Sequence, residues 1–220
     1  MSSKGLGDDA AVDYVFRVQT LGSEKCGKTS YLMTATGEEC PSRKPKDPPL
    51  KFETIVNYND KTAKVIAYDM LGRRSKDVFR SDDHYQKLHG VILLADMTVE
   101  DSHATFLKFY WHITAKNKAK IPMVALGTMY DKKEERKWTK QQAKEECSCA
   151  DIRYVEISSK TGRNVEGSLK VLVKNMMEWA DAHPVTYKTG DMKSDPTFTT
   201  ENMEGDSEAV ESAGGCCVVS

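Results

Sequence analysis

The run LGSEKCGKTS, residues 21–30, contains groups whose spacing suits phosphate binding. It follows the pattern G-x4-G-K-T, in which glycines let main-chain N–H groups point at a phosphate. The lysine at the end of such a loop reaches the phosphate oxygens, and the threonine hydroxyl after it ligates Mg²⁺. The predicted phosphate-binding residues are Gly22, Ser23, Glu24, Lys25, Cys26, Gly27, Lys28, Thr29 and Ser30, and Thr29 is also a predicted metal ligand.

Three later stretches, each at the end of an apolar run, carry groups that suit the same ligand. Asp69 can hold Mg²⁺ through water, and Gly72, three residues later, can offer its N–H to a γ-phosphate. The carboxylate of Asp131 can accept two hydrogen bonds from N1 and N2 of guanine, which adenine cannot offer. A backbone N–H in the stretch EISSK, residues 156–160, can meet the guanine oxygen.

Apolar runs that alternate with amphipathic stretches would position these residues. Strands are predicted at 14–21, 54–58, 62–68, 91–97, 121–127 and 153–157. Helices are predicted at 28–36, 99–116, 139–147 and 165–182, with Thr139 as an N-cap. Alternating strands and helices imply parallel pairing, with helices on both faces of one sheet. We therefore expect an α/β fold class: a single P-loop domain with a mostly parallel, six-stranded sheet.

The composition fits one domain with terminal extensions. Of 220 residues 39% are hydrophobic, which is enough for a core, and the net charge of −1 argues against a nucleic-acid partner. We expect a flexible N-terminus at 1–12, the domain at 13–183 and a flexible acidic tail at 184–220. Six unevenly spaced cysteines indicate a reducing, cytosolic setting. We see no run typical of a signal peptide or of a membrane-spanning helix.

The order and spacing of these motifs resemble the Ras superfamily of small GTPases over residues 14–182. The stretches GVILLADMTVEDSHATF and SSKTGRNVEGSL look most like the Rab branch. The resemblance implies GTP or GDP and Mg²⁺ as cofactors, GTP hydrolysis, and a switch role in vesicle-mediated transport with effector and exchange-factor proteins as partners. The base-contacting residues that it implies are Thr128, Met129, Asp131, Ser158, Ser159 and Lys160.

The chain departs from the family pattern at two positions that bear on hydrolysis. Arg73 stands where the family has the glutamine that orients the attacking water. A guanidinium has no acceptor and cannot be deprotonated, so no catalytic residue is assigned and slow hydrolysis is expected. As an alternative role, Arg73 could stabilise charge on the phosphate. Counting back from Asp69 at the family spacing places Asp47, or Lys46 if the hairpin is one residue longer, where the family's first switch loop has its Mg²⁺-binding threonine. The carboxylate of Asp47 can still ligate that ion.

Three further departures lie beside the expected ligand. Thr128 and Met129 replace an asparagine and a lysine of the family's base-contacting loop, which is here residues 128–131 and is called the base loop below. We expect Thr128 to lose the tie between the base loop and the phosphate loop, whereas Met129 keeps some of the packing against the guanine. Glu24 would repel a γ-phosphate about 4 Å away by up to ~4 kcal/mol at an effective dielectric of about 20. Alternatively its side chain points to solvent, or pairs with Lys25 or Arg73.

The chain ends in GGCCVVS, and Cys216 and Cys217 resemble a double geranylgeranylation site. The last four residues also read as a farnesylation box, so the type of lipid stays open. Stable anchoring takes two signals, and this acidic tail offers no polybasic one, which favours two lipids. The resemblance thus implies a prenyltransferase, a prenyl-binding carrier, and a peripheral place on the cytoplasmic side of an endomembrane or the plasma membrane, with a cytosolic pool.

Two other functions remain open from the sequence. A pseudo-GTPase scaffold would bind partners independently of the γ-phosphate. A P-loop kinase is the third hypothesis, but Asp131 and the terminal cysteines speak against it.

Overall fold

The computed structural model describes residues 12–40, 51–69, 85, 87–100, 102–117 and 119–183. The chain divides into two units, Met1–Thr189 and Gly190–Ser220, and every described residue lies in the first. Several predicted positions therefore lie outside the described residues, as do the two terminal extensions apart from Val12. These positions are Asp47, Gly72, Arg73, Cys216 and Cys217.

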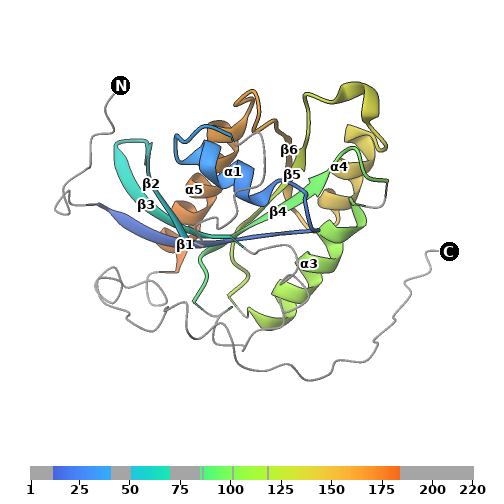
Figure 1. Ribbon diagram of the computed structural model, residues 1–220. Coiled ribbons are helices and arrows are strands. Elements are labelled where there is room, and N and C mark those ends of the chain that lie inside the picture. The colour runs from blue at the N-terminus through green and yellow to red at the C-terminus, as the bar shows by residue number, and fades with distance from the viewer. Residues whose placement is uncertain are drawn as a thin grey trace, which may run out of the picture. The chain divides into compact units, whose positions relative to one another are not determined.

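Six strands form one sheet in the order β2-β3-β1-β4-β5-β6 (Figure 1). They span Tyr14–Gly22 (β1), Lys51–Tyr58 (β2), Lys61–Tyr68 (β3), Gly90–Asp96 (β4), Met123–Thr128 (β5) and Arg153–Glu156 (β6). The β2–β3 hairpin is antiparallel and the other four neighbouring pairs are parallel. The expected mostly parallel, six-stranded sheet is confirmed.

Helices cover both faces of this sheet. The described helices are Lys28–Ala35 (α1), Ala104–Lys116 (α3), Lys140–Ser148 (α4) and Val165–Ala182 (α5), with a short 3₁₀ helix at Lys133–Glu135 (η2). The helices α1 and α5 lie on one face, and α3 and α4 on the other (Figure 1).

The strand β4 shows why the core has two halves. Ile92 and Leu94 are fully buried in the cluster that α1 and α5 cover, whereas Val91 and Leu93 are fully buried in the cluster that α3 and α4 cover. A central parallel strand buried on both faces requires a continuous apolar run, and GVILLAD is one.

The start of helix α3 differs from the predicted one because of local hydrogen bonds, and the start of strand β5 differs because of a proline. The helix α3 begins at Ala104, not at 99. The Asp96 carboxylate accepts hydrogen bonds from the backbone N–H and the hydroxyl of Thr98, 2.8 and 2.7 Å long, and the Ser102 hydroxyl donates to the Asp96 carbonyl. These bonds hold residues 97–100 and residue 102 in turns and a bend. The strand β5 begins after Pro122, which has no N–H to donate.

The strand β2 begins three residues earlier than predicted, at Lys51. Phe52 is 4% exposed and pairs with Ala67, so this end of the strand contributes to the core. Glu53 forms ion pairs with Lys51 and with Lys64 across the hairpin, 2.5 and 2.8 Å long. Side-chain pairs on adjacent strands stabilise a sheet in this way, and a count of apolar residues alone does not detect them.

The helix α4 begins as predicted. The Thr139 hydroxyl accepts a hydrogen bond from the backbone N–H of Gln142, 3.2 Å long, and the Gln142 side chain accepts one from the Thr139 N–H, 2.8 Å long. This reciprocal arrangement is a capping box, which satisfies two donors at the helix N-terminus.

The junction before β4 contains a titratable group that sets a pH dependence. The backbone N–H of Arg17 donates to His89 Nδ1 at 3.0 Å, and the His89 N–H donates to the Arg17 carbonyl at 2.9 Å. Burial, and then the Arg17 guanidinium, lower the pKa of His89 from 6.5 to about 4.

We expect the free energy of unfolding to fall by roughly 1 to 2 kcal/mol between pH 7 and pH 5 because of His89. The unfolded imidazole takes up a proton below pH 6.5, whereas the folded one stays neutral until about pH 4. Urea unfolding of the wild type and of His89→Asn, which keeps an acceptor at this place, measures the effect across this range. Parallel curves for the two proteins would contradict it.

Candidate functional site

The phosphate loop connects β1 to α1, and its glycines are required by its shape. Gly27 has a φ of 92°, in the left-handed region where a Cβ is unfavourable. A Cβ on Gly22 would lie 2.3 Å from the carbonyl oxygen of Leu94, so only glycine lets the loop pass the end of β4 this closely. The two glycines of the sequence motif therefore set the path of the backbone.

The Lys28 ammonium lies inside this loop. Its Nζ donates hydrogen bonds to the carbonyl oxygens of Gly22 and Ser23, 2.9 and 2.8 Å long, and the residue is 5% exposed. A cation held against neutral carbonyls in a buried place is well placed to exchange them for phosphate oxygens, to which it binds more strongly. The helix α1 begins at the same residue and adds the positive end of its dipole.

A pair of oxygen ligands lies beside the loop. The Thr29 hydroxyl donates a hydrogen bond to Asp69 Oδ2, and Asp69 is only 3% exposed. The two residues come from α1 and from the end of β3, and a hydroxyl with a carboxylate is a ligand set that Mg²⁺ accepts. The residues present thus fit this ion.

Thr128 joins the base loop to the phosphate loop, which corrects the expectation that it would not. Its hydroxyl donates a 2.9 Å hydrogen bond to the carbonyl of Cys26 and lies 3.2 Å from the carbonyl of Ala95. The two loops are close enough for a short side chain, since a Cβ on Gly27 would lie 3.9 Å from the Thr128 Cβ. A threonine therefore reaches the acceptor without the longer amide side chain of the family pattern.

The other base-loop residues surround the end of β5. Met129 has a left-handed φ of 63°, and a Cβ on Gly27 would lie 3.8 Å from its Cε, so its side chain approaches the phosphate loop. Asp131 is exposed, and its Oδ1 accepts a 2.7 Å hydrogen bond from the Ser158 hydroxyl. This bond restrains the direction of a carboxylate on an exposed residue.

The loop after β6 contacts both the base loop and helix α1. The Ser158 hydroxyl also accepts a hydrogen bond from the N–H of Thr161, 3.3 Å long. The Ser159 carbonyl accepts one from the Thr34 hydroxyl of α1, 3.2 Å long. Lys160 is exposed. The structure thus brings the predicted residues of the phosphate loop, of the base loop and of this third loop together at the carboxyl ends of the parallel strands.

The phosphate loop has exposed charged side chains facing solvent and a neutral thiol beneath it. Glu24 and Lys25 are exposed, which agrees with the alternative that Glu24 points to solvent. Cys26 is fully buried, and burial raises the pKa of its thiol, so the side chain beneath the loop stays neutral. Of the two lysines in the loop, Lys28 is the buried one.

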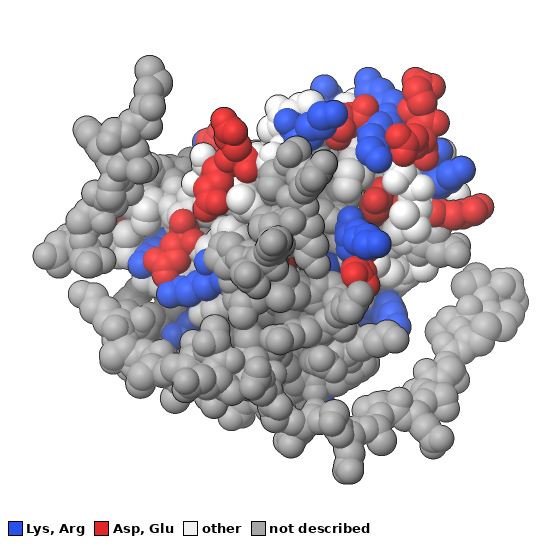
Figure 2. All heavy atoms as spheres, viewed as in Figure 1, with Lys and Arg blue, Asp and Glu red and all other residues white. Residues whose placement is uncertain are grey.

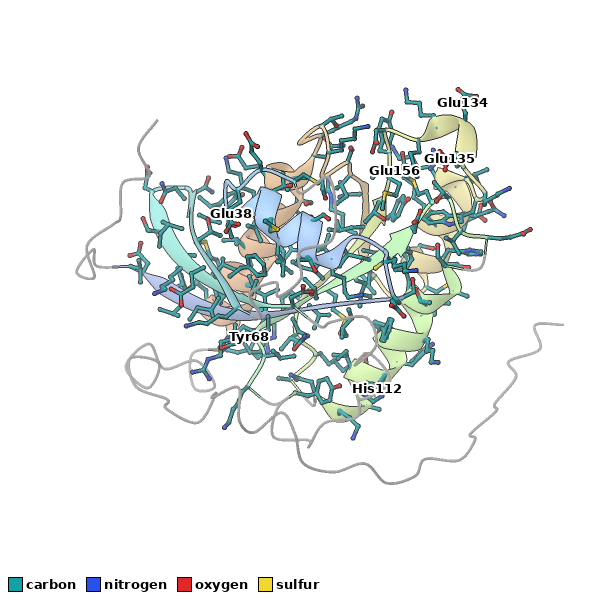
Figure 3. All side chains as sticks on the ribbon, in the orientation of Figure 1. Glu38, Tyr68, His112, Glu134, Glu135 and Glu156 are labelled. Carbon is teal, nitrogen blue, oxygen red and sulfur yellow. The ribbon has the colours of Figure 1, made fainter. Side chains whose placement is uncertain are left out.

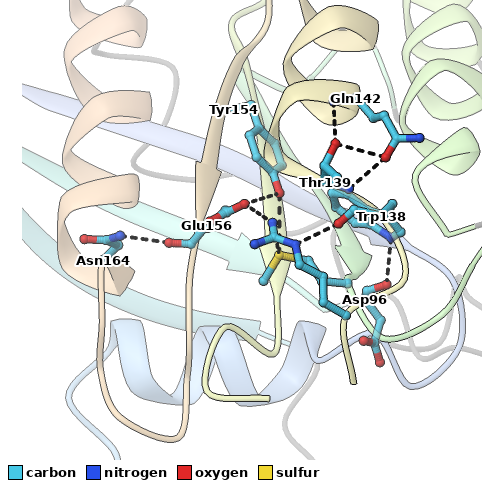
Figure 4. Close-up of polar contacts among 9 residues, drawn as sticks. Asp96, Trp138, Thr139, Gln142, Tyr154, Glu156 and Asn164 are labelled. Carbon is cyan, nitrogen blue, oxygen red and sulfur yellow. Dashed lines mark hydrogen bonds and ion pairs between the residues drawn. The ribbon is translucent and has the colours of Figure 1, made fainter. Parts of the chain in front are cut away.

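An ion pair between a half-buried arginine and a buried glutamate lies next to the base loop, and the sequence interpretation missed it (Figure 4). The Arg136 guanidinium binds Glu156 Oε1 and donates a 2.7 Å hydrogen bond to the Trp138 carbonyl. Glu156 is 7% exposed, and its own carbonyl accepts a 2.8 Å hydrogen bond from the Asn164 side chain. The pair joins the segment after Asp131 to the end of β6.

Glu156 differs in exposure from the acidic residues of η2, because it is 7% exposed whereas Glu134 and Glu135 are exposed. In Figure 3 the labels place Glu156 beside β6, whereas Glu134 and Glu135 lie on η2 at the edge of the molecule. Among the residues that Figure 2 colours, Lys and Arg are interspersed with Asp and Glu. A buried charge with a partner is therefore the informative one, although nothing in the sequence marks Arg136 as different from its charged neighbours.

None of the helices that the structure describes is long and apolar enough to cross a membrane. Within the same part of the chain, no group of three or more His, Cys, Asp or Glu residues is arranged to hold a metal ion.

Comparison with known proteins agrees with the geometry. A model of the Ras family matches residues 17–178 of this 220-residue chain. Human Rab-30 is 27% identical over 157 residues, which cover 70% of this chain and 76% of the relative. Mouse Rab-21 is 23% identical over 205 residues, which cover 93% of this chain and 92% of the relative. RABC1 of Arabidopsis thaliana is 28% identical over 173 residues, which cover 76% of this chain and 79% of the relative. The chain therefore belongs to the Ras family and is a Rab-like small GTPase at low sequence identity.

Proposed function

We propose that this protein is a guanine-nucleotide-binding switch of membrane traffic with slow intrinsic GTP hydrolysis. The observation that carries the proposal is the Thr128 hydrogen bond to Cys26, which connects the carboxylate-bearing base loop to the phosphate loop. Membership in a family of GTPases that bind guanine nucleotide with Mg²⁺ supports it.

Each loop contributes one part of nucleotide binding. The amides of residues 25–28 would bind the phosphates, and Lys28 would leave the carbonyls of Gly22 and Ser23 for phosphate oxygens. The Thr29 hydroxyl and Asp69 would hold Mg²⁺, which neutralises phosphate charge when bound. Asp131, held by Ser158, would accept hydrogen bonds from N1 and N2 of guanine.

Slow hydrolysis follows from Arg73 at the position of the water-orienting glutamine. The exposed Glu24 adds a negative charge on the outer side of the loop, and solvent screens it there. We therefore assign the catalytic weakness to Arg73 first. Gly72 and Asp47 would complete the contacts to γ-phosphate and Mg²⁺.

Membrane attachment would come from the chain end. Lipids on Cys216 and Cys217, added by a prenyltransferase and shielded by a prenyl-binding carrier, would give a peripheral position on a cytoplasmic membrane face and a cytosolic pool. Effectors and exchange factors are the protein partners that this role requires. The relatives named Rab support it.

We expect Arg73→Gln to hydrolyse GTP faster than the wild type, by roughly tenfold, which corresponds to about 1.4 kcal/mol of transition-state stabilisation. A glutamine can accept and donate hydrogen bonds to a water molecule, and arginine can only donate. Single-turnover hydrolysis of radiolabelled GTP measures the change, with Arg74→Gln as the matched control for loss of the same charge. Equal rates for Arg73→Gln and the wild type would refute this assignment.

The bond between the two loops gives a second prediction. Thr128→Val removes only the hydroxyl and leaves the Cys26 carbonyl without this donor, so we expect GDP to dissociate about fivefold faster, for a loss of about 1 kcal/mol. Stopped-flow release of fluorescent GDP measures it. Thr114→Val is the control, because its hydroxyl donates to the Tyr110 carbonyl within α3. If both variants release GDP at the wild-type rate, the bond has no role in nucleotide retention.

The scaffold alternative is favoured by one observation, the arginine at position 73. Hydrogen exchange of segments 38–50 and 70–85, with GDP and with a non-hydrolysable GTP analogue bound, separates the two functions. A switch responds to the γ-phosphate, so we expect greater amide protection of both segments with the analogue. Equal protection in the two states would favour the scaffold.

A further inference from the structure

Tyr130, a residue that the proposed function does not use, lies in a stack with two cations. The Arg163 guanidinium carbon lies 4.3 Å from the centre of the Tyr130 ring, and Lys133 Nζ lies 5.1 Å from it. Lys133 belongs to the segment that follows Tyr130, whereas Arg163 comes from the loop after β6. The Arg163 contact therefore joins two loops that are far apart in the sequence.

The position of this stack relates it to the base-reading carboxylate. Tyr130 directly precedes Asp131, and its N–H donates a 3.0 Å hydrogen bond to the Ile157 carbonyl. On the other loop, the Ser158 N–H donates to the Arg163 carbonyl at 3.1 Å, and the Ser158 hydroxyl binds Asp131 at 2.7 Å. Ser158 is thus bonded both to the Asp131 carboxylate and to the backbone of Arg163, the residue that supplies the stacked guanidinium.

We propose that Tyr130 and Arg163 are positioning residues that hold Asp131 in the orientation required to read guanine. This inference rests on the proposed binding of a guanine nucleotide. Arg163 and Asp131 are exposed and Tyr130 is half-buried, so the Ser158 hydroxyl alone would have to hold a solvated carboxylate against water. The stack restrains the backbone on both sides of that bond, and the carboxylate then loses less freedom when the base binds.

The chemistry of the stack determines which substitutions keep it. A planar guanidinium stacks on an aromatic face, and an ammonium at the same place retains part of the attraction. The attraction comes from the ring, so the Tyr130 hydroxyl is not required. The contact is with the base loop, so its loss should alter base recognition more than phosphate binding.

Release of fluorescent GDP and of fluorescent inosine diphosphate from the full chain tests the proposal. Inosine lacks the N2 amine that would donate to Asp131, so the ratio of the two release rates reports how well the carboxylate is aligned. We expect Arg163→Ala to release GDP about two- to fivefold faster and to discriminate less between the two nucleotides. Tyr130→Leu should release GDP as fast as Arg163→Ala does. Arg163→Lys should show a release rate between those of Arg163→Ala and the wild type, and Tyr130→Phe should release GDP at the wild-type rate.

The control is Arg153→Ala, which removes the same charge from an exposed position at the start of β6. The proposal would be overturned if Arg163→Ala released GDP at the wild-type rate, or if Arg153→Ala accelerated release as much as Arg163→Ala does. It would also be overturned if Arg163→Ala accelerated the release of both nucleotides equally, because that result indicates a general loosening of the site. If the wild type retains neither nucleotide, it is the proposed function that fails. Arg163 is exposed, and thermal unfolding of each variant verifies that the fold is intact.

Discussion

Parallel strand pairing is the constraint on which the site depends. The strands β3, β1, β4, β5 and β6 run in one direction, so the loops that follow them emerge at the same edge of the sheet. The phosphate loop, Asp69, the base loop and the loop after β6 meet there. Because a parallel sheet needs helices on both faces, the two core clusters that fix the strands also fix this edge.

At that edge, neighbouring loops are joined by short polar contacts. Thr128 binds the phosphate loop, Ser158 binds Asp131, and Thr29 binds Asp69, each from a different element. Behind them, the pair of Arg136 and Glu156 is largely removed from solvent. A buried pair costs desolvation and contributes little net stability, but it is specific in geometry, which suits a role in holding loops in register.

The residues that we propose for nucleotide binding differ from the one that the family uses to orient water for hydrolysis. The proposed binding uses main-chain amides, Lys28 and the carboxylates of Asp69 and Asp131, all of which lie in the described residues. Hydrolysis in this family requires a group that orients water, and the chain has arginine at that position.

The sequence alone determined the order of strands and helices, the phosphate motif and the carboxylates at strand ends, because periodicity and glycine spacing are local properties of the chain. It misplaced the starts of β2, α3 and β5, where side chains and a proline decide the boundary. Only the tertiary structure decided that Thr128 reaches Cys26, 102 positions away, and that Arg163 stacks on Tyr130. Such contacts depend on how closely two loops approach, and that distance is set by the packing of the whole sheet.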